Sequence, residues 1–231
     1  METLRDILDA VARDDLPPSD GRVTVVPQLS ERDAGVLAFT AHAVVFTDED
    51  PRWVHDTLAA VPCDALAAPM NPYFLTALLD RTGRTAETID AMLVGTPLPG
   101  EPPLPLREIT DGDHPRIVYA RRRRDDVRAW TTEGGVVVLG RGVGGRLEVS
   151  VEIDEDVRHR GLGRALVAGA RHLTAEPLWA QVAPGNARSL RAFLAAGYRP
   201  VGSEAVLLSA RQSPLNVSAT GGSSGCSRSR S

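Results

Sequence analysis

Residues 146–173, RLEVSVEIDEDVRHRGLGRALVAGARHL, decide the fold, because they predict a strand, a glycine-containing turn and a helix in succession. Over 146–154 apolar and polar residues alternate, which is typical of a strand with one buried and one solvated face. The apolar positions are Leu147, Val149, Val151 and Ile153, and the polar ones are Glu148, Ser150 and Glu152. Over 161–174 the apolar residues recur at helical spacing and predict a helix with one apolar stripe.

The segments around this unit predict a mixed sheet with helices packed on it. Strands are expected at 106–110, 127–132, 136–140, 178–183 and about 201–208, with a short helix ending in Arg121–Arg124 and a further helix at 187–196. The second helix is expected to be capped by Asn186 at its start and by Gly197 at its end. The order β-α-β-β-β-α-β-α-β over residues 105–210 therefore predicts the α/β (mixed α+β) class.

A proline-rich segment, GTPLPGEPPLP at 95–105, separates this region from a smaller α/β region at 1–100. In that N-terminal region we expect helices at 2–13, 51–61, 71–82 and 85–94, and strands at 23–27 and within 35–47. Residues 67–72 are similar to 182–186, which suggests a degenerate copy of the same fold; alternatively, the region shapes the pocket of an acceptor. Residues 211–231 are rich in Ser and Gly and are predicted to be a disordered tail.

Composition and charge exclude several classes of function. The chain of 231 residues has a net charge of −4, and all 26 of its basic residues are arginine, so no lysine is present for Schiff-base or P-loop chemistry. The negative charge and the scarcity of aromatic residues make nucleic-acid binding improbable. Two cysteines without zinc-binding spacing predict no metal site. The absence of a signal-like or long apolar segment predicts a cytoplasmic protein without membrane contact.

One turn carries the pattern of a phosphate site. Arg158 to Ala165, RHRGLGRA, has the form R-x-x-G-x-G/A at the junction of the alternating strand and the following helix. The glycines permit a tight turn with exposed N–H groups, and the positive end of the helix dipole favours an anion. The simpler interpretation is that Gly161 and Gly163 only allow the helix to pack closely on the strand.

A second motif follows in VAPGNARSLRAFLAAGYRPVG, residues 182–202, where Asn186, Ser189, Phe193, Gly197 and Tyr198 fit the pattern N-x-x-[AS]-x-x-x-[FY]-x-x-x-G-[FY]. With both motifs in this order, residues 105–209 resemble the GNAT superfamily of acyl-CoA-dependent N-acyltransferases. The resemblance implies the mixed central sheet flanked by helices that is typical of that family. It also implies acetyl-CoA as co-substrate and an amine as acceptor, either a small molecule or a protein.

The resemblance further implies which residues hold coenzyme A. The pyrophosphate would lie on backbone amides of the turn, and the pantetheine arm would pair with the preceding strand as an added strand does. Asn186 would lie near the pantetheine or adenylate end, unless it serves only as a helix cap. The implied set is Val151, Ile153, Arg158, His159, Arg160, Gly161, Leu162, Gly163, Arg164, Asn186, Ser189 and Phe193.

Direct transfer to an amine also needs a proton acceptor, because an alkyl ammonium has a pKa of about 10.4. Glu148 and Glu152 are the candidates on the alternating strand, although such residues are more often simply solvated. Phe193 stands where the family often has a tyrosine that protonates the thiolate, and phenylalanine cannot do so. The sequence therefore predicts an N-acetyltransferase or, as the alternative, a weakly active or inactive acyl-CoA-binding module. The four arginines 121–124 are expected to be a solvated helix end.

Overall fold

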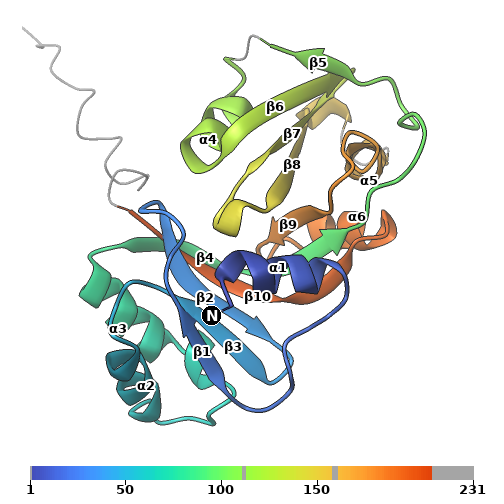
Figure 1. Ribbon diagram of the computed structural model, residues 1–231. Coiled ribbons are helices and arrows are strands. Elements are labelled where there is room, and N and C mark those ends of the chain that lie inside the picture. Colours follow the sequence, from blue (N-terminus) through green and yellow to red (C-terminus); the bar gives the residue numbers. More distant parts are fainter. Residues whose placement is uncertain (1, 111–112, 158–160, 210–231) are drawn as a thin grey trace, which may run out of the picture.

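The computed structural model describes residues 2–110, 113–157 and 161–209, which form one ten-stranded mixed sheet with helices on both faces (Figure 1). The first half contains α1 Leu4–Ala12, β1 Val23–Val26, β2 Asp33–Phe39, β3 His42–Phe46, α2 Pro51–Ala59, α3 Pro72–Thr82 and β4 Thr85–Gly95. The second half contains β5 Arg107–Ile109, α4 Pro115–Arg123, β6 Asp125–Thr132, β7 Gly135–Arg141, β8 Leu147–Ile153, α5 Leu162–Ala170, β9 Leu178–Val182, α6 Ala187–Ala195 and β10 Arg199–Leu208.

The α/β class and the order of elements after residue 105 are confirmed. One helix prediction is wrong, because residues 85–94 form strand β4. Alanine, glutamate, methionine and leucine in this segment favour a helix locally. However, the run Ala91 to Val94 is apolar without interruption, and its backbone pairs on both sides with strands from the other half of the chain. Tertiary pairing therefore overrides the local preference.

The last strand of each half pairs with strands of the other half. The sheet order is β1-β3-β2-β10-β4-β9-β8-β7-β6-β5. Strand β4, which ends the first half, pairs with β9, while β10, which ends the second half, pairs with both β2 and β4. Whether residues 1–100 and 105–210 are separate domains stays a prediction, but their strands share one hydrogen-bonded sheet.

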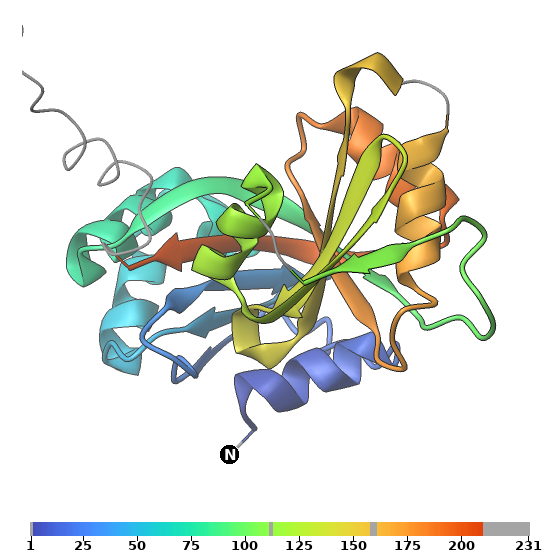
Figure 2. The same cartoon turned by 90° about the horizontal axis from the view of Figure 1, so that it is seen from above.

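Helices cover both faces of this sheet (Figure 2). Helix α1 packs on one face of the N-terminal strands through Leu4, Leu8 and Val11, and α2 and α3 pack on the other face. In the second half, α5 and α6 share a core with β7 to β9, whereas α4 packs on β6 and β7 in a separate cluster. The helices of the described residues include none with the length and apolar content that a membrane span needs. The predicted tail, 211–231, lies outside the described residues.

The close approach of β10 to β2 generates a prediction about stability. A Cβ atom at Gly202 would meet the carbonyl oxygen of Ala38, a backbone atom that cannot rotate away. We expect Gly202→Ala to lower the free energy of unfolding by about 1–3 kcal/mol, the usual cost of overpacking, as measured by urea denaturation. Gly185→Ala is the matched control, because a Cβ there meets no atom of the described residues within 4 Å. Equal stability of the two variants would contradict the close approach of β10 to β2 at Gly202.

Candidate active site

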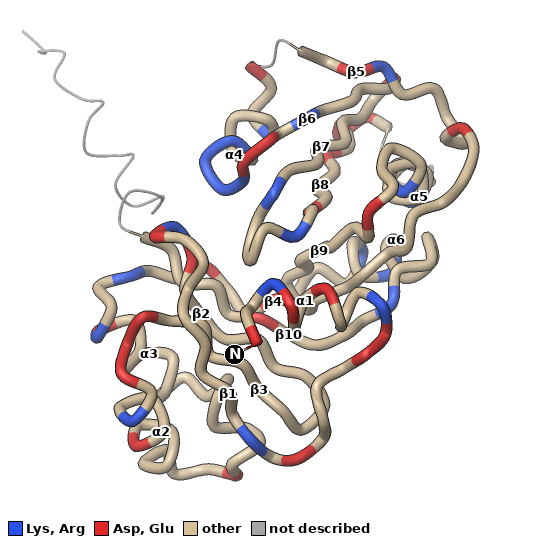
Figure 3. Tube along the Cα trace, viewed as in Figure 1, with Lys and Arg blue, Asp and Glu red and all other residues tan. Residues whose placement is uncertain are grey.

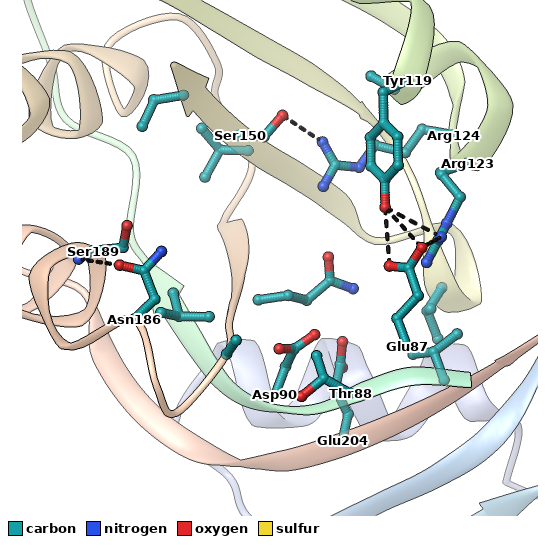
Figure 4. Close-up of a pocket in the computed structure, with 18 of the residues that line it drawn as sticks. Glu87, Thr88, Asp90, Tyr119, Arg123, Arg124, Ser150, Asn186, Ser189 and Glu204 are labelled. Carbon is teal, nitrogen blue, oxygen red and sulfur yellow. Dashed lines mark hydrogen bonds and ion pairs between the residues drawn. The ribbon is translucent and has the colours of Figure 1, made fainter. Parts of the chain in front are cut away.

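A cavity lies where the parallel strands β8 and β9 separate. In the described chain these two strands pair at one position, Glu148 with Trp179, whereas β8 pairs with β7 along its whole length. The cavity has a volume of about 250 Å³ and is bordered by β4, β8, β9, β10, α4 and α6 (Figure 4). Both halves of the chain therefore contribute to its walls.

The start of α5 lies beside the far end of β8. Its N-cap residue, Gly161, has a φ of 82° and supplies no capping side chain, in contrast to Thr3, Asp50 and Asn71 at the starts of α1, α2 and α3. The N–H groups in the first turn of a helix have no acceptor within that helix, so this end can receive an anion. A Cβ at Gly163 would lie 3.7 Å from Cγ1 of Ile153, which is ordinary contact. Arg158, His159 and Arg160 lie outside the described residues.

Helix α6 brings three residues of the second motif to the cavity: Asn186, Ser189 and Phe193. The side-chain oxygen of Asn186 accepts a hydrogen bond from the backbone N–H of Ser189 at 3.1 Å, which confirms its role as N-cap. The ring of Phe193 is buried and packs edge to face against Tyr198, with 5.0 Å between ring centroids. The predicted contacts of these residues, and of Val151 on the β8 wall, with coenzyme A stay predictions.

Glu148 is buried, with 3% of its surface exposed, so the expected solvated face is wrong at this position. Its carboxylate accepts hydrogen bonds from Arg124 and Arg146, each at 2.9 Å, from Gln181 at 3.1 Å and from the backbone of Val143 at 3.2 Å. Burial alone would raise the pKa of Glu148, but the two guanidinium groups outweigh it and lower that pKa below its ordinary value. The carboxylate is therefore held in its charged form within a saturated network.

Glu152 has a different environment. Its carboxylate pairs with Nε of Arg116 at 3.1 Å, its side chain is 40% exposed, and it is absent from the residues that border the cavity. The role of Glu148 or Glu152 as proton acceptor stays a prediction. The contacts of Glu148 favour a structural function, and the position of Glu152 favours a surface ion pair.

At one end, the cavity is bordered by residues of α4 and β4 that the sequence did not indicate as site residues. The hydroxyl of Tyr119 donates to Glu87 at 3.1 Å, and Nη1 of Arg123 donates to the same carboxylate at 3.1 Å (Figure 4). Figure 3 shows the basic end of α4 in blue. Arg123 and Arg124 border the cavity and form ion pairs there, so the expected solvated helix end is wrong for these two residues. Nothing local in the sequence signals the partners, because Glu87 and Glu148 are distant along the chain.

Asp90 on β4 is a further missed residue. It borders the cavity, is partly buried, and lies opposite Glu204 in the register of β4 and β10. Burial and the negative charge of Glu87 raise the pKa of Asp90, and the opposing effects of Arg123 and Arg146 are smaller. Within the described part of the chain, its carboxylate forms no hydrogen bond or ion pair. The continuous apolar run that follows it could have indicated a strand, but not this location.

Comparison with known proteins finds similar solved structures. No protein-family model matches the chain, and no curated protein matches it. A GCN5-related N-acetyltransferase from Kribbella flavida is 18% identical, with a TM-score of 0.38, over 59% of this chain and 63% of that one. An acetyltransferase of the GNAT family from Colwellia psychrerythraea is 7% identical, with a TM-score of 0.38, over 59% and 62%. A GCN5-related N-acetyltransferase from Sphaerobacter thermophilus is 14% identical, with a TM-score of 0.35, over 58% of this chain and 55% of that one. The chain thus spans less than two thirds of the length of these proteins.

The network around Glu148 generates a prediction about stability. Glu148→Gln leaves Arg146 buried with one charged partner fewer, and we expect a loss of about 3–5 kcal/mol in the free energy of unfolding at pH 7. Because the folded state lowers the pKa of Glu148, its stabilising contribution is complete above about pH 4.3 and is lost as the pH falls further.

Urea denaturation at pH 7 and at pH 3.5 measures both effects. Glu152→Gln is the matched control, since its exposed ion pair with Arg116 contributes about 0–1 kcal/mol. A cost for Glu148→Gln as small as that of the control would show that the buried network does not stabilise the fold.

Proposed function

We propose that this chain is an N-acetyltransferase of the GNAT type, which transfers the acetyl group of acetyl-CoA to a primary amine by direct attack. The observation that carries the proposal is the separation of the parallel strands β8 and β9 beside a cavity. The separation leaves an edge of β8 that an extended thioester arm can pair with as an additional strand does. The sequence motifs and the uncapped start of α5 agree with this assignment.

Coenzyme A would occupy the side of the cavity between β8 and α6. Its pyrophosphate would lie on the first-turn N–H groups of α5, with the side chain of Arg164 beside it; Arg158, the first arginine of the motif, lies outside the described residues. The pantetheine arm would follow β8 at Val151 to Ile153. Among the described residues only the side-chain oxygen of Asn186 has a partner, the N–H of Ser189, so the amide NH2 can donate to the cofactor while the oxygen caps the helix.

The acceptor would enter from the opposite end, where Glu87, Tyr119 and Arg123 lie (Figure 4). Because β4 supplies Glu87, the N-terminal half would shape the acceptor pocket, as one of the two sequence hypotheses holds. No hydroxyl at position 193 is available to protonate the departing thiolate. A thiolate with a pKa of about 8.5 is nevertheless an acceptable leaving group, so water can supply that proton after the bond breaks.

Two measurements on the full chain test this proposal. Calorimetry should detect binding of acetyl-CoA, and a thiol reagent should detect release of free coenzyme A when acetyl-CoA is mixed with primary amines. The panel comprises spermidine, tyramine, kanamycin and a peptide with a free N-terminus. Binding together with turnover of at least one amine is expected. If acetyl-CoA does not bind, or if it binds and no amine is acetylated, the proposal is wrong.

The position of Gly163 generates a prediction about the pyrophosphate site. Gly163→Glu introduces a negative charge at the first turn of α5, and we expect the affinity for coenzyme A to fall at least tenfold while the melting temperature stays within a few degrees. The fold tolerates a side chain here, since among the described residues only Ile153 comes within 4 Å of a Cβ at this position. Gly163→Gln separates charge from size and should weaken binding less. Unchanged affinity of Gly163→Glu by calorimetry would overturn the site.

Phe193 generates a second prediction for the reaction. Because Phe193 borders the cavity, the hydroxyl of Phe193→Tyr can point into it. We expect the affinity for coenzyme A to stay within about twofold and kcat to be at least that of the wild type. A positioned acid typically contributes about 10²–10⁴-fold, and an introduced one contributes less. Loss of coenzyme A binding would instead show that Phe193 is solely a packing residue and that the alignment of the second motif is wrong.

A further inference from the structure

We propose that Asp90 accepts the proton that the acceptor ammonium must lose before its nitrogen can attack the acetyl group. The proposal rests on the acetyltransferase function proposed above and adds the missing proton acceptor. Asp90 comes from the N-terminal half of the chain, outside the region whose motifs resemble the GNAT superfamily.

The position of Asp90 fits this role. Strand β4 begins to pair with β9 at the next residue, where Ala91 lies opposite Val182. Asp90 therefore lies at the end of the paired region, where the cavity between β8 and β9 opens. Figure 4 shows Asp90 between the Asn186 side of the cavity, assigned to coenzyme A, and the Glu87 side, assigned to the acceptor. A proton acceptor must come within hydrogen-bond reach of the attacking nitrogen, which lies where the two substrates meet.

The other carboxylates at the cavity are already paired. Glu87 accepts from Tyr119 and Arg123, Glu148 from Arg124 and Arg146, Asp33 from Arg32, and Glu204 from Arg146. Protonation of such a carboxylate would leave its arginine with one negative partner fewer, at the greatest cost where the pair is buried, so these groups are poor sites for repeated protonation. Among the described residues that border the cavity, Asp90 is the carboxylate whose oxygens have no such partner.

The charges around Asp90 also suit a base. Glu87 on the same strand and Glu204 on β10 are negative, Arg123 on α4 and Arg146 before β8 are positive, and the neutral hydroxyl of Tyr119 lies beside Glu87. Burial and Glu87 together raise the pKa of Asp90, which brings the carboxyl closer to the pH at which it operates. The same negative charge attracts an acceptor that arrives as an ammonium ion.

The proposed step balances as follows. The carboxylate of Asp90 takes one proton from the ammonium nitrogen and becomes a carboxylic acid. The freed electron pair of nitrogen forms a bond with the acetyl carbon, and the carbon–sulfur bond breaks with its electrons on sulfur. The new amide nitrogen then releases a second proton, which the thiolate takes up to give the thiol of coenzyme A. Asp90 releases the proton that it accepted to water and returns to its carboxylate form. The products are the acetylated amine, coenzyme A and one proton.

Asp90→Asn tests the inference with the amine from the panel that the wild type acetylates fastest. Asparagine has nearly the same shape as aspartate but cannot accept the proton, so kcat/KM at pH 7 should fall by about 10²–10⁴-fold. The affinity for coenzyme A should stay within about twofold. Asp90→Glu should recover part of the rate. Asp80→Asn, which changes an exposed carboxylate on α3, is the matched control and should behave as the wild type.

The pH profile separates proton transfer from a structural effect. In the wild type, kcat/KM should fall as the pH decreases through the pKa of Asp90, because the protonated acid accepts nothing. It should be level between that pKa and the pKa of the amine. In Asp90→Asn only the free amine reacts, so kcat/KM should rise about tenfold per pH unit up to about pH 10. The difference in kcat/KM between the wild type and the variant should therefore become smaller as the pH rises.

Each outcome decides between the possibilities. An active wild type together with an Asp90→Asn variant of equal rate and equal profile overturns the role of Asp90 and leaves the proposed function intact. A variant that is uniformly slower at every pH, with its profile unchanged, also overturns it. Loss of coenzyme A binding in both Asp90→Asn and Asp90→Glu would show a structural role. A wild type that acetylates no amine overturns the proposed function and, with it, this inference.

Discussion

The backbone pairing of β4 with β10 joins the two halves of the chain into one sheet. Each of these strands ends one half of the chain, and each pairs on its other edge with a strand of the opposite half, β9 for β4 and β2 for β10. Because every hydrogen-bonding edge in this region is used by the other half, neither half can complete its sheet alone. Close contacts confirm how tightly the seam is packed, since Gly202 on β10 leaves room for the carbonyl of Ala38 and the Met92 side chain.

The candidate site lies at this seam, and this pairing explains its composition. On one side, β8 and β9 separate after a single paired position and leave space for an extended arm. On the other side, β4 places Glu87 and Asp90 against α4 of the second half. Strand β8 and helix α6 therefore border one side of the cavity, while residues of both halves form the other side. Ligand sites commonly occur where such units meet.

Buried charge holds the two sides in a fixed arrangement. Arg146 pairs with Glu148 at 2.9 Å and with Glu204 at 2.8 Å, and its guanidinium lies 5.0 Å from the ring centroid of Trp179. These contacts join the turn before β8 to β10 and β9. Because Arg124 completes the network from the end of α4, the cavity wall is anchored by ionic contacts at its base. Such networks constrain geometry even where they contribute little net stability.

Features that depend on neighbouring residues could be predicted from the amino-acid sequence. The alternation in β8, the apolar stripe of α5, the glycine turn between them and the Asn186 cap are all local, and the structure has the strands, helices and cap where those patterns predict them. The tertiary structure alone decided that residues 85–95 form a strand, that Glu148 is buried, that Arg123 and Arg124 are paired, and that Asp90 lies in the cavity. Each of these depends on a partner from a distant part of the chain. Periodicity reports which face of an element is apolar, but not which segment covers the other face.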